Sequence, residues 1–380
     1  MFLLPFHVIG VSHAANSAER VGRLRLSVER TDELLAALRA RESSAVLLST
    51  CHRTELYWWG EEELGEWFVT EVIGDTSNVR IDRVDADLAV RHLFSVASGM
   101  QSVRYGEPEI LGQVRRSWIA SREAGTACGP IDALFRQSID AARHIRAAMG
   151  SEGDPTLGDR VVERMAAHRR QYDTGSTEGA CRVLVIGSGD AARSTLEALR
   201  AADDALLPSL DISVTSRTDE RAATIAERFG VATKPWEHRA GAVQQADVVI
   251  FAAHVTSPLI APDFAPFMPE RAGRALWIDL GVPGAVSTEF EAAQVDVVPL
   301  KAIAGVEAPL LQVERTRRAS SALQHELDRY ARATHRLQLG ARLGALEERA
   351  VAAAIAHGDA SAEGVARRVT RLVLRELTRA

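Results

Sequence analysis

The sequence is poor in cysteine, in metal-binding motifs and in long hydrophobic runs. It holds only three cysteines in 380 residues, Cys51, Cys128 and Cys181, and no Cys-x-x-Cys pair. It therefore predicts neither a disulfide framework nor a metal site. No apolar run approaches the about 18 residues of a membrane helix, and the first residues lack a basic leader and a cleavage site. We expect a cytoplasmic protein with no membrane partner.

Excess positive charge is also absent. The formal net charge is -6, which argues against a general nucleic-acid binder, so no DNA partner is expected. A shape-selective RNA partner needs only a local basic surface, so RNA stays open. What is present, 46% hydrophobic and 25% charged residues, is typical of a globular protein long enough for two domains and an appendage.

The first part of the chain mixes strand and helix patterns. Hydrophobic periodicity predicts strands at 6–12 and 45–51 around a helix at 27–40, followed by amphipathic helices at 87–99, 109–125 and 131–150. The sequence therefore predicts an N-terminal α+β domain over residues 1–155.

After the polar segment 171–180, strand and helix patterns alternate. The apolar runs lie at 182–187, 211–216, 247–253, 275–281 and 295–300. This alternation is typical of a parallel sheet with crossover helices. We expect a Rossmann-type domain over residues 170–303, within a multidomain α/β fold.

The C-terminal part is helical throughout. The pattern predicts one long helix over 306–336 and two amphipathic stretches at 343–358 and 364–380. A helix that long needs a packing partner. Residues 304–380 are therefore expected to form a helical dimerisation domain, and the protein a homodimer.

A glycine-rich turn follows the first strand of the Rossmann-type domain. Gly187 permits a tight turn, Gly189 lets the backbone approach a pyrophosphate, and Ala192 stands at the position that brings helix and strand together. Ser188, Asp190 and Ala191 complete this turn. A dinucleotide is expected here; the alternatives are a domain that has lost its ligand or binds another nucleotide.

The end of the second strand indicates which dinucleotide. It reads Ser216-Arg217-Thr218 and has no acidic residue to bind a ribose 2'-hydroxyl. Arg217 can instead pair with a 2'-phosphate, which favours NADPH. The alternative is a solvated arginine at a strand end.

Motifs across nearly the whole chain resemble glutamyl-tRNA reductases. The residues 49–57, STCHRTELY, are similar to the family's STCNRTE signature, with His52 replacing asparagine. Further matches follow in the family's order: Gly10-Val11-Ser12-His13, His92-Leu93-Phe94, Ala97-Ser98-Gly99, Gly106 to Gln113, Arg217-Thr218, and Asp279 with Val282-Pro283.

This resemblance implies a reaction and its residues. Cys51 would attack the ester of glutamyl-tRNA, and NADPH would reduce the thioester to glutamate-1-semialdehyde for tetrapyrrole synthesis, without a metal. A thiolate is both a strong nucleophile and a good acyl leaving group, and the neighbouring His52 and Arg53 are expected to lower the pKa of Cys51.

The resemblance also implies roles for other side chains and a partner. His92, expected at the start of a helix, would relay a proton to the departing ribose, and Arg53 would hold the γ-carboxylate. The remaining substrate contacts would come from Thr50, Glu55, Ser102, Glu107 and Gln113. A glutamate-1-semialdehyde aminotransferase is an implied partner.

Several positions depart from the family's pattern: Ala14-Ala15, His52, Gln101, Arg104-Tyr105, Glu109 and Gly284. A diverged paralogue acting on another aminoacyl-tRNA or in a specialised pathway therefore stays open, as does a non-catalytic tRNA- or NADPH-binding regulator. A shikimate-type dehydrogenase would need a lysine in the first domain. The two lysines, Lys234 and Lys301, lie outside it.

Overall fold

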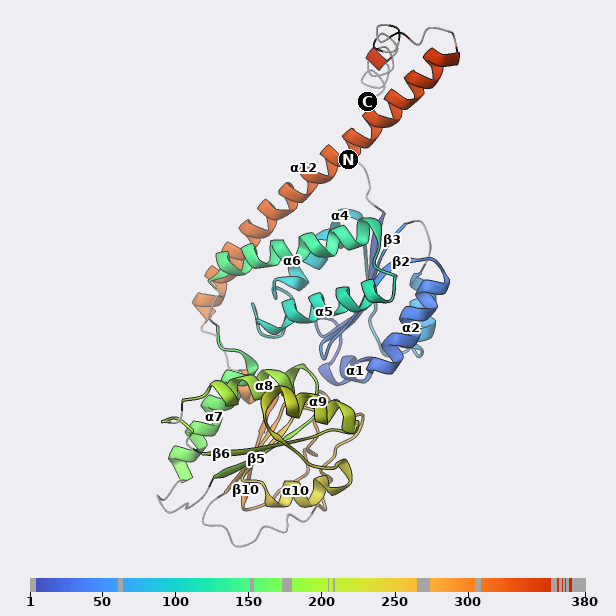
Figure 1. Ribbon diagram of the computed structural model, residues 1–380. Helices are drawn as coiled ribbons and strands as arrows, with labels where there is room; N and C mark the ends of the chain where they lie inside the picture. Colours follow the sequence, from blue (N-terminus) through green and yellow to red (C-terminus); the bar gives the residue numbers. More distant parts are fainter. Residues whose placement is uncertain are drawn as a thin grey trace. The chain divides into compact units, whose positions relative to one another are not determined.

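A computed structural model describes most of the chain (Figure 1). The described residues are 5–60, 64–150, 154–172, 180–203, 205–207, 209–264, 274–304 and 309–356, with 361, 364, 366, 369 and 370. The chain divides into two compact units, Met1–Ser320 and Ser321–Ala380. The first unit contains both sheets.

The N-terminal sheet is antiparallel and four-stranded. Its strands are β1 (Phe6–Ser12), β2 (Ser44–Ser49), β3 (Arg53–Trp59) and β4 (Asp82–Asp85), in the order β2-β3-β1-β4. The sequence patterns predicted the first two strands. They missed β3, which follows β2 after a turn of only three residues.

Helices cover both faces of this sheet (Figure 1). The helical segments are α1 (Ala18–Arg23), α2 (Val28–Ala40), α3 (Gly65–Phe68), η1 (Val69–Ile73), α4 (Ala86–Ala97), α5 (Glu109–Glu123) and α6 (Gly129–Met149). Leu34, Leu35 and Leu38 of α2 pack on one face of the sheet. Helices α4, α5 and α6 contact the strands from the other face.

Strand alternation decides which side chains of β3 point toward α4 to α6. Successive side chains on a strand point to opposite faces. Leu56 and Trp58 join the apolar core beneath α2. Arg53, Glu55 and Tyr57 therefore lie on the opposite face, and this alternation buries a polar cluster between the sheet and the three helices.

The second sheet is parallel and six-stranded, as the alternating pattern predicted. Its strands are β5 (Cys181–Ile186), β6 (Leu210–Thr215), β7 (Ala232–Thr233), β8 (Val248–Phe251), β9 (Ala275–Asp279) and β10 (Val295–Pro299), in the order β10-β9-β8-β5-β6-β7. Five of these strands match the five predicted apolar runs; β7, only two residues long, was missed.

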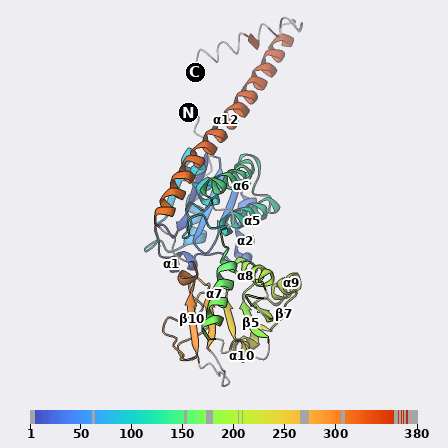
Figure 2. The ribbon, with the colours of Figure 1, turned by 90° about the vertical axis from the view of Figure 1, so that its left-hand side faces the viewer.

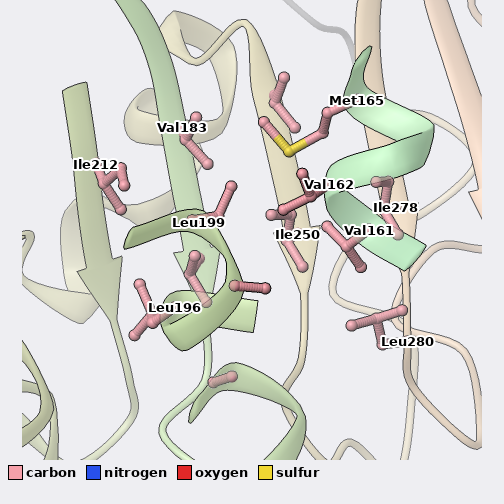
Figure 3. Close-up of a cluster of buried hydrophobic side chains, with 14 of the residues drawn as sticks. Val161, Val162, Met165, Val183, Leu196, Leu199, Ile212, Ile250, Ile278 and Leu280 are labelled. Carbon is pink, nitrogen blue, oxygen red and sulfur yellow. The ribbon is translucent and has the colours of Figure 1, made fainter. Parts of the chain in front are cut away.

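Two apolar cores hold helices to the two faces of this sheet. The helices are α7 (Leu157–Tyr172), α8 (Asp190–Ala201), α9 (Asp219–Phe229), the 3₁₀ turn η2 (Trp236–His238), α10 (Arg239–Gln245) and α11 (Leu300–Ala304). Val161, Val162 and Met165 of α7 and Leu196 and Leu199 of α8 point toward the strands (Figure 3). In the turned view, α7 lies in front of the sheet (Figure 2).

The opposite face carries α10 and an aromatic group. Val243 of α10 packs with Phe251, Trp277 and Phe290. The Trp277 and Phe290 rings stack with centroids 5.1 Å apart. The domain is therefore a three-layer sandwich, which leaves the carboxyl ends of the parallel strands free to carry a ligand site.

The C-terminal helix is longer than predicted. Helix α12 runs from Pro309 to Ala356 without interruption, so the stretch 343–356 continues it and does not form a separate helix. Proline suits the first position of a helix, and no proline follows it in this span. The stretch 364–380 lies mostly outside the described residues. Within the described part of the chain, no helix has the length and apolarity required to cross a membrane.

Candidate active site

The candidate nucleophile lies in the tight turn between β2 and β3. The backbone N–H of Thr50 donates to the carbonyl of Arg53 over 2.8 Å, which closes the turn around Cys51 and His52. The hydroxyl oxygen of Thr50 accepts from the backbone N–H groups of His52 and Arg53, each over 3.2 Å. Thr50 is thus buried and shapes the turn that presents Cys51.

The thiol of Cys51 contacts the next side chain along the chain. Its Sγ lies 3.3 Å from Nδ1 of His52. Burial raises the pKa of Cys51 to about 11, against a lowering by the charge of Arg25. The expectation of a lowered thiol pKa is therefore wrong, because desolvation of the thiolate outweighs the nearby positive charges.

The imidazole of His52 is uncharged near neutral pH. Burial lowers its pKa to about 4, and the charges of His13, Arg53 and Arg25 act in the same direction. The His13 ring packs edge-on against it, with centroids 5.5 Å apart. The turn therefore holds a neutral thiol against a neutral imidazole.

Behind the turn, β3 buries a charged network. Nη1 of Arg53 donates to Oε1 of Glu55 over 2.9 Å, and Nη2 donates to the carbonyl of Gln101 over 2.6 Å. The hydroxyl of Tyr57 donates to Oε2 of Glu55 over 2.7 Å. Burial raises the pKa of Glu55, but Arg53, His92 and these hydrogen bonds lower it more, to about 2.

This network needs a glycine on the neighbouring strand. Gly10 of β1 faces Glu55 in the register. A Cβ at position 10 would lie 2.5 Å from the carbonyl oxygen of Thr54 and 2.6 Å from Cγ of Glu55. The Gly10 position therefore leaves room for the buried carboxylate.

His92 lies in the middle of α4 (Ala86–Ala97). The prediction that it lies at the start of a helix is therefore wrong. Its Nε2 is 3.1 Å from Oε1 of Glu55, and its Nδ1 is 3.4 Å from the amide nitrogen of Gln101. Because a carboxylate only accepts, Nε2 of His92 carries the proton. Glu55 thereby fixes the orientation of His92, as a carboxylate commonly does for a catalytic histidine.

The segment between α4 and α5 carries two further predicted substrate residues, Ser102 and Glu107, both partly buried. Burial raises the pKa of Glu107 to about 7, and the neighbouring charge of Glu109 adds to this. Arg146 of α6 donates to the carbonyls of Gly106 and Glu107 over 2.9 and 2.7 Å, which fixes this segment beside the β3 network.

Helix α5 carries Gln113 and contacts the nucleotide-binding domain. Gln113 is partly buried. One turn further along, Arg116 pairs with Asp190 of α8 over 2.6 Å. Glu109, at the start of α5, accepts from the backbone N–H of Leu157 over 2.6 Å. Helix α5 therefore connects the N-terminal domain with α7 and α8.

The glycine-rich turn has the geometry that a pyrophosphate needs. Gly187 has φ +124, and a Cβ there would lie 2.6 Å from the carbonyl oxygen of Ala252. At Gly189 a Cβ would meet nothing within 4 Å, so the space beside it is open. Helix α8 begins directly after Gly189, and its free N–H groups suit an anion. Ala192 is fully buried, as its position against the sheet requires.

The end of β6 lies beside this turn. The hydroxyl oxygens of Ser188 and Ser216 are 3.1 Å apart. Arg217 is exposed, and its guanidinium donates to the carbonyl of His254 over 3.1 Å. Thr218 immediately precedes α9, which begins at Asp219 and has Asp219 and Glu220 in its first turn. Ala191, in the first turn of α8, is partly buried.

Arg25 is a residue that the motifs missed. It follows α1, and hydrogen bonds hold the backbone on both sides of it to the strand ends at the β2–β3 turn. The Leu26 N–H donates to the Ser49 hydroxyl over 2.9 Å, and the Thr54 hydroxyl donates to the Leu24 carbonyl over 3.1 Å. Its guanidinium is partly exposed. No motif marks Arg25, because its proximity to Cys51 comes from the tertiary fold.

The three cysteines are free, and the structure separates their environments. Cys51 is partly exposed in the β2–β3 turn, Cys128 is exposed before α6, and Cys181 is partly exposed at the start of β5. Among these three, Cys51 contacts a histidine side chain, that of His52. The geometry therefore singles out Cys51 as the candidate nucleophile.

Comparisons with known proteins agree with this arrangement. A family model described as the N-terminal domain of glutamyl-tRNAGlu reductase matches residues 9–149, and one described as shikimate / quinate 5-dehydrogenase matches residues 171–306. Glutamyl-tRNA reductase of Deinococcus radiodurans is 30% identical over 293 residues, which cover 76% of this chain and 80% of that protein.

A second relative and a solved structure are also similar. Glutamyl-tRNA reductase of Salinibacter ruber is 32% identical over 288 residues, which cover 73% of this chain and 57% of that protein. The structure of glutamyl-tRNA reductase from Methanopyrus kandleri is 22% identical, with a TM-score of 0.49, and the match covers 97% of this chain and 93% of that chain.

Proposed function

Because this chain belongs to the glutamyl-tRNA reductase family, we propose that it reduces glutamyl-tRNA to glutamate-1-semialdehyde with NADPH and releases tRNA, in the five-carbon route of tetrapyrrole synthesis. The observation that supports this proposal best is the presentation of Cys51 in the β2–β3 turn, in front of the Arg53–Glu55–His92 network.

Cys51 is the nucleophile in this proposal. Its sulfur attacks the ester carbonyl carbon, and the ester bond to the ribose oxygen breaks, which leaves a thioester on the enzyme. A thioester accepts hydride far more readily than an ester does. We retain His92 as the predicted proton relay to the departing ribose oxygen. This role requires its Nε2–H to leave Glu55, the carboxylate that orients the ring in this structure.

The network residues hold the site more than they touch substrate. Both oxygens of Glu55 accept bonds from protein groups, and the guanidinium of Arg53 is buried against Glu55 and Gln101. We assign Glu55 to positioning His92 and Arg53. The predicted contact of Arg53 with the γ-carboxylate of the substrate would use the N–H groups of Arg53 that do not bond to Glu55 or Gln101.

Arg25 provides a second cation for the substrate's carboxylate. It is partly exposed beside the turn, and its charge acts on both Cys51 and His52. A guanidinium binds a carboxylate through two parallel hydrogen bonds. Ser102, Glu107 and Gln113 stay as predicted contacts of the aminoacyl and terminal adenosine groups.

The nucleotide-binding domain fits a phosphorylated dinucleotide. The open space at Gly189, the start of α8 and the hydroxyls of Ser188 and Ser216 suit the pyrophosphate and ribose. The exposed Arg217 suits a 2'-phosphate and favours NADPH over NADH. When bound, NADPH supplies the hydride for the thioester. Arg217→Ala should weaken binding of NADPH but not of NADH.

The proposal extends to location and partners. Aminoacyl-tRNA and NADPH are both cytoplasmic metabolites, and we place the protein there. The product aldehyde is reactive, so handover to an aminotransferase that acts on glutamate-1-semialdehyde is part of the proposal. We also retain the homodimer through residues 304–380 and the first domain over 1–155. The Rossmann-type domain, expected over 170–303, we extend back to Leu157, because α7 packs on the parallel sheet.

Single-turnover incubation with glutamyl-tRNA and NADPH tests the function. Wild type should form a glutamyl adduct on Cys51 and then the semialdehyde, whereas Cys51→Ser should form neither product at a comparable rate. Mass spectrometry of the Cys51 peptide detects the adduct, and Cys128→Ser is the matched control that should keep full activity. Acylation by a different aminoacyl-tRNA alone would favour the paralogue, and no acylation at all the regulator.

A further inference from the structure

We propose that His52 is the general base that takes the thiol proton of Cys51 during acylation. This role rests on the proposed function for its substrate, but it concerns the reactivity of the thiol itself. Asparagine, the residue usual at this position in the family's signature, cannot accept a proton. The inference therefore assigns a catalytic residue to this chain that the signature does not contain.

The contact between the two side chains is fixed by the backbone. Cys51 Sγ and His52 Nδ1 are 3.3 Å apart, a hydrogen-bonding distance for sulfur. Hydrogen bonds hold the backbone of both residues: the Thr50 hydroxyl accepts from the His52 N–H, and the Thr50 N–H donates to the Arg53 carbonyl. His13 also donates from its backbone N–H to the His52 carbonyl over 3.0 Å. The base therefore lies ready at the nucleophile.

The other groups around the pair keep both partners neutral. Burial raises the pKa of Cys51 to about 11, and Arg25 lowers it while Glu107 and Asp190 raise it. Burial lowers the pKa of His52 to about 4, with His13, Arg53 and Arg25 adding to this effect. Between these two values the thiol keeps its proton and the imidazole is free to accept it.

A free thiolate would be too rare to carry the reaction at neutral pH. A thiol with a pKa of about 11 is ionised to roughly one part in 10⁴ at pH 7, because each pH unit below the pKa reduces the thiolate tenfold. Proton transfer to His52 in the same step as carbon–sulfur bond formation makes the attack independent of the hydroxide concentration. This is how a neighbouring base activates a weak nucleophile.

The proton and the bonds balance within this step. The S–H proton moves to Nδ1 of His52 while Sγ forms a bond to the ester carbonyl carbon. The carbon–oxygen bond to the ribose then breaks, and the proton passes to the departing oxygen, which leaves as a hydroxyl. Thiol plus ester becomes thioester plus alcohol, and His52 returns to its neutral form without another reactant.

Alkylation by iodoacetamide measures the thiol without tRNA. We would use the full chain with Cys128→Ser and Cys181→Ser, so that Cys51 is the only thiol, and compare His52 with His52→Asn and His52→Gln from pH 5.5 to 9.5. With His52, the rate should be nearly independent of pH, since the base is unprotonated throughout. Without it, the rate should rise about tenfold per pH unit, as expected for a reaction through the thiolate alone.

The size of the effect follows from these slopes. The ratio of the His52 protein's rate to that of either variant should be largest at pH 5.5 and should shrink about tenfold for each unit of higher pH. His13→Asn is the matched control, because the His13 ring packs on His52 but its buried Nδ1 has no hydrogen-bond partner among the described residues; it should keep the flat profile. Thermal melting and NADPH binding check that each variant is folded.

Two outcomes overturn the inference. One is a tenfold rise per pH unit in the presence of His52; the other is equal rates for His52 and both folded variants. Acylation by glutamyl-tRNA, measured on the same proteins, separates this from the proposed function. A flat alkylation profile without acylation by glutamyl-tRNA would contradict the proposed function and support His52 as the base. Acylation with equal pH slopes for His52 and its variants would support the function and contradict the role of His52.

Discussion

At the scale of single residues, the site depends on a buried carboxylate with three donors. Glu55 accepts from Arg53, Tyr57 and His92, and it is almost completely buried. Such a group stabilises a protein only while its partners are all present, because an unpaired buried charge is costly. This property makes the network a source of measurable stability differences.

We expect Glu55→Gln to destabilise the protein by about 3 to 5 kcal/mol, since it leaves the buried guanidinium of Arg53 without its counter-charge. Urea unfolding at pH 7 measures this. The matched control is Glu197→Gln, whose pair with Arg228 is 60% exposed on both sides and is worth less than about 1 kcal/mol. Equal effects of the two substitutions would contradict the role of the network.

The same variant has a defined dependence on pH. The pKa of Glu55 in the folded protein, about 2, lies below its usual value of about 4.3. Its contribution is therefore complete above about pH 4.3 and is lost as the pH falls through about 2. The stability difference between wild type and Glu55→Gln should narrow over that interval.

The raised pKa of Glu107 predicts the opposite dependence of stability on pH. Its pKa is raised to about 7 by burial and by Glu109, so the folded state binds more protons than the unfolded state between about pH 4.3 and 7. Its protonated form stabilises the fold at low pH, and this stability is lost as the pH rises through about 7. Glu107→Gln should remove the loss and make the protein about 2 to 3 kcal/mol more stable at pH 8.

Urea unfolding at pH 5 and pH 8 measures this difference. Glu123→Gln is the control, because Glu123 is exposed at the end of α5, and it should change neither value by more than about 0.5 kcal/mol. If Glu107→Gln were equally destabilised at both pH values, the carboxyl would act through a hydrogen bond and not through its ionisation.

At the scale of elements, the sequence predicted α2, α4, α5, α6 and the five longer parallel strands, because their periodicity is regular. It did not predict the helices α1, α3 and α7. It missed β3, although Arg53, Glu55 and Tyr57 alternate there with Thr54, Leu56 and Trp58. The strand buries both faces, so charged residues occupy positions that a half-buried strand would fill with apolar ones. Alternation of charge with apolar residues was the available signal.

The candidate site shows the same limit. Signature spacing identified Cys51, Arg53 and His92, and the structure brings Arg53 and His92 together on Glu55. The sequence signature did not predict the raised pKa of Cys51, because desolvation depends on tertiary packing around the turn and not on the two adjacent residues. The position of Arg25 depends on tertiary packing in the same way.

The glycine-rich turn allows an element-scale prediction with an internal control. Gly187→Ala should destabilise the nucleotide-binding domain by at least about 1 to 3 kcal/mol, because position 187 combines φ +124 with a collision against Ala252. Gly189→Ala should leave stability nearly unchanged, since its Cβ meets no protein atom.

Ligand binding should separate the same two glycines differently. The Cβ of Gly189→Ala would enter the space proposed for the pyrophosphate, so NADPH affinity should fall at least about tenfold without loss of melting temperature. Fluorescence titration with NADPH and differential scanning calorimetry give the two values. Unchanged affinity in Gly189→Ala would place the dinucleotide elsewhere.

At the scale of the whole molecule, α12 needs a surface to pack on. In proteins most of the stability of a helix comes from tertiary packing of an apolar face. On α12, Val313 is 67% exposed and Val351 is 37% exposed. Within residues 304–380, we propose that the apolar stretch around Val351 forms the contact between subunits, whereas Val313 lies in the first turns of α12.

These two valines form a matched pair for testing the homodimer. We expect sedimentation velocity at about 5 μM to show a dimer for the full chain, because a second copy would cover the apolar positions of α12 that are exposed in one chain. Val351→Glu places a charge in the proposed interface and should yield monomers, whereas Val313→Glu should leave the dimer intact. Dissociation by Val313→Glu alone would move the interface to the start of α12, and a monomeric wild type would exclude the homodimer.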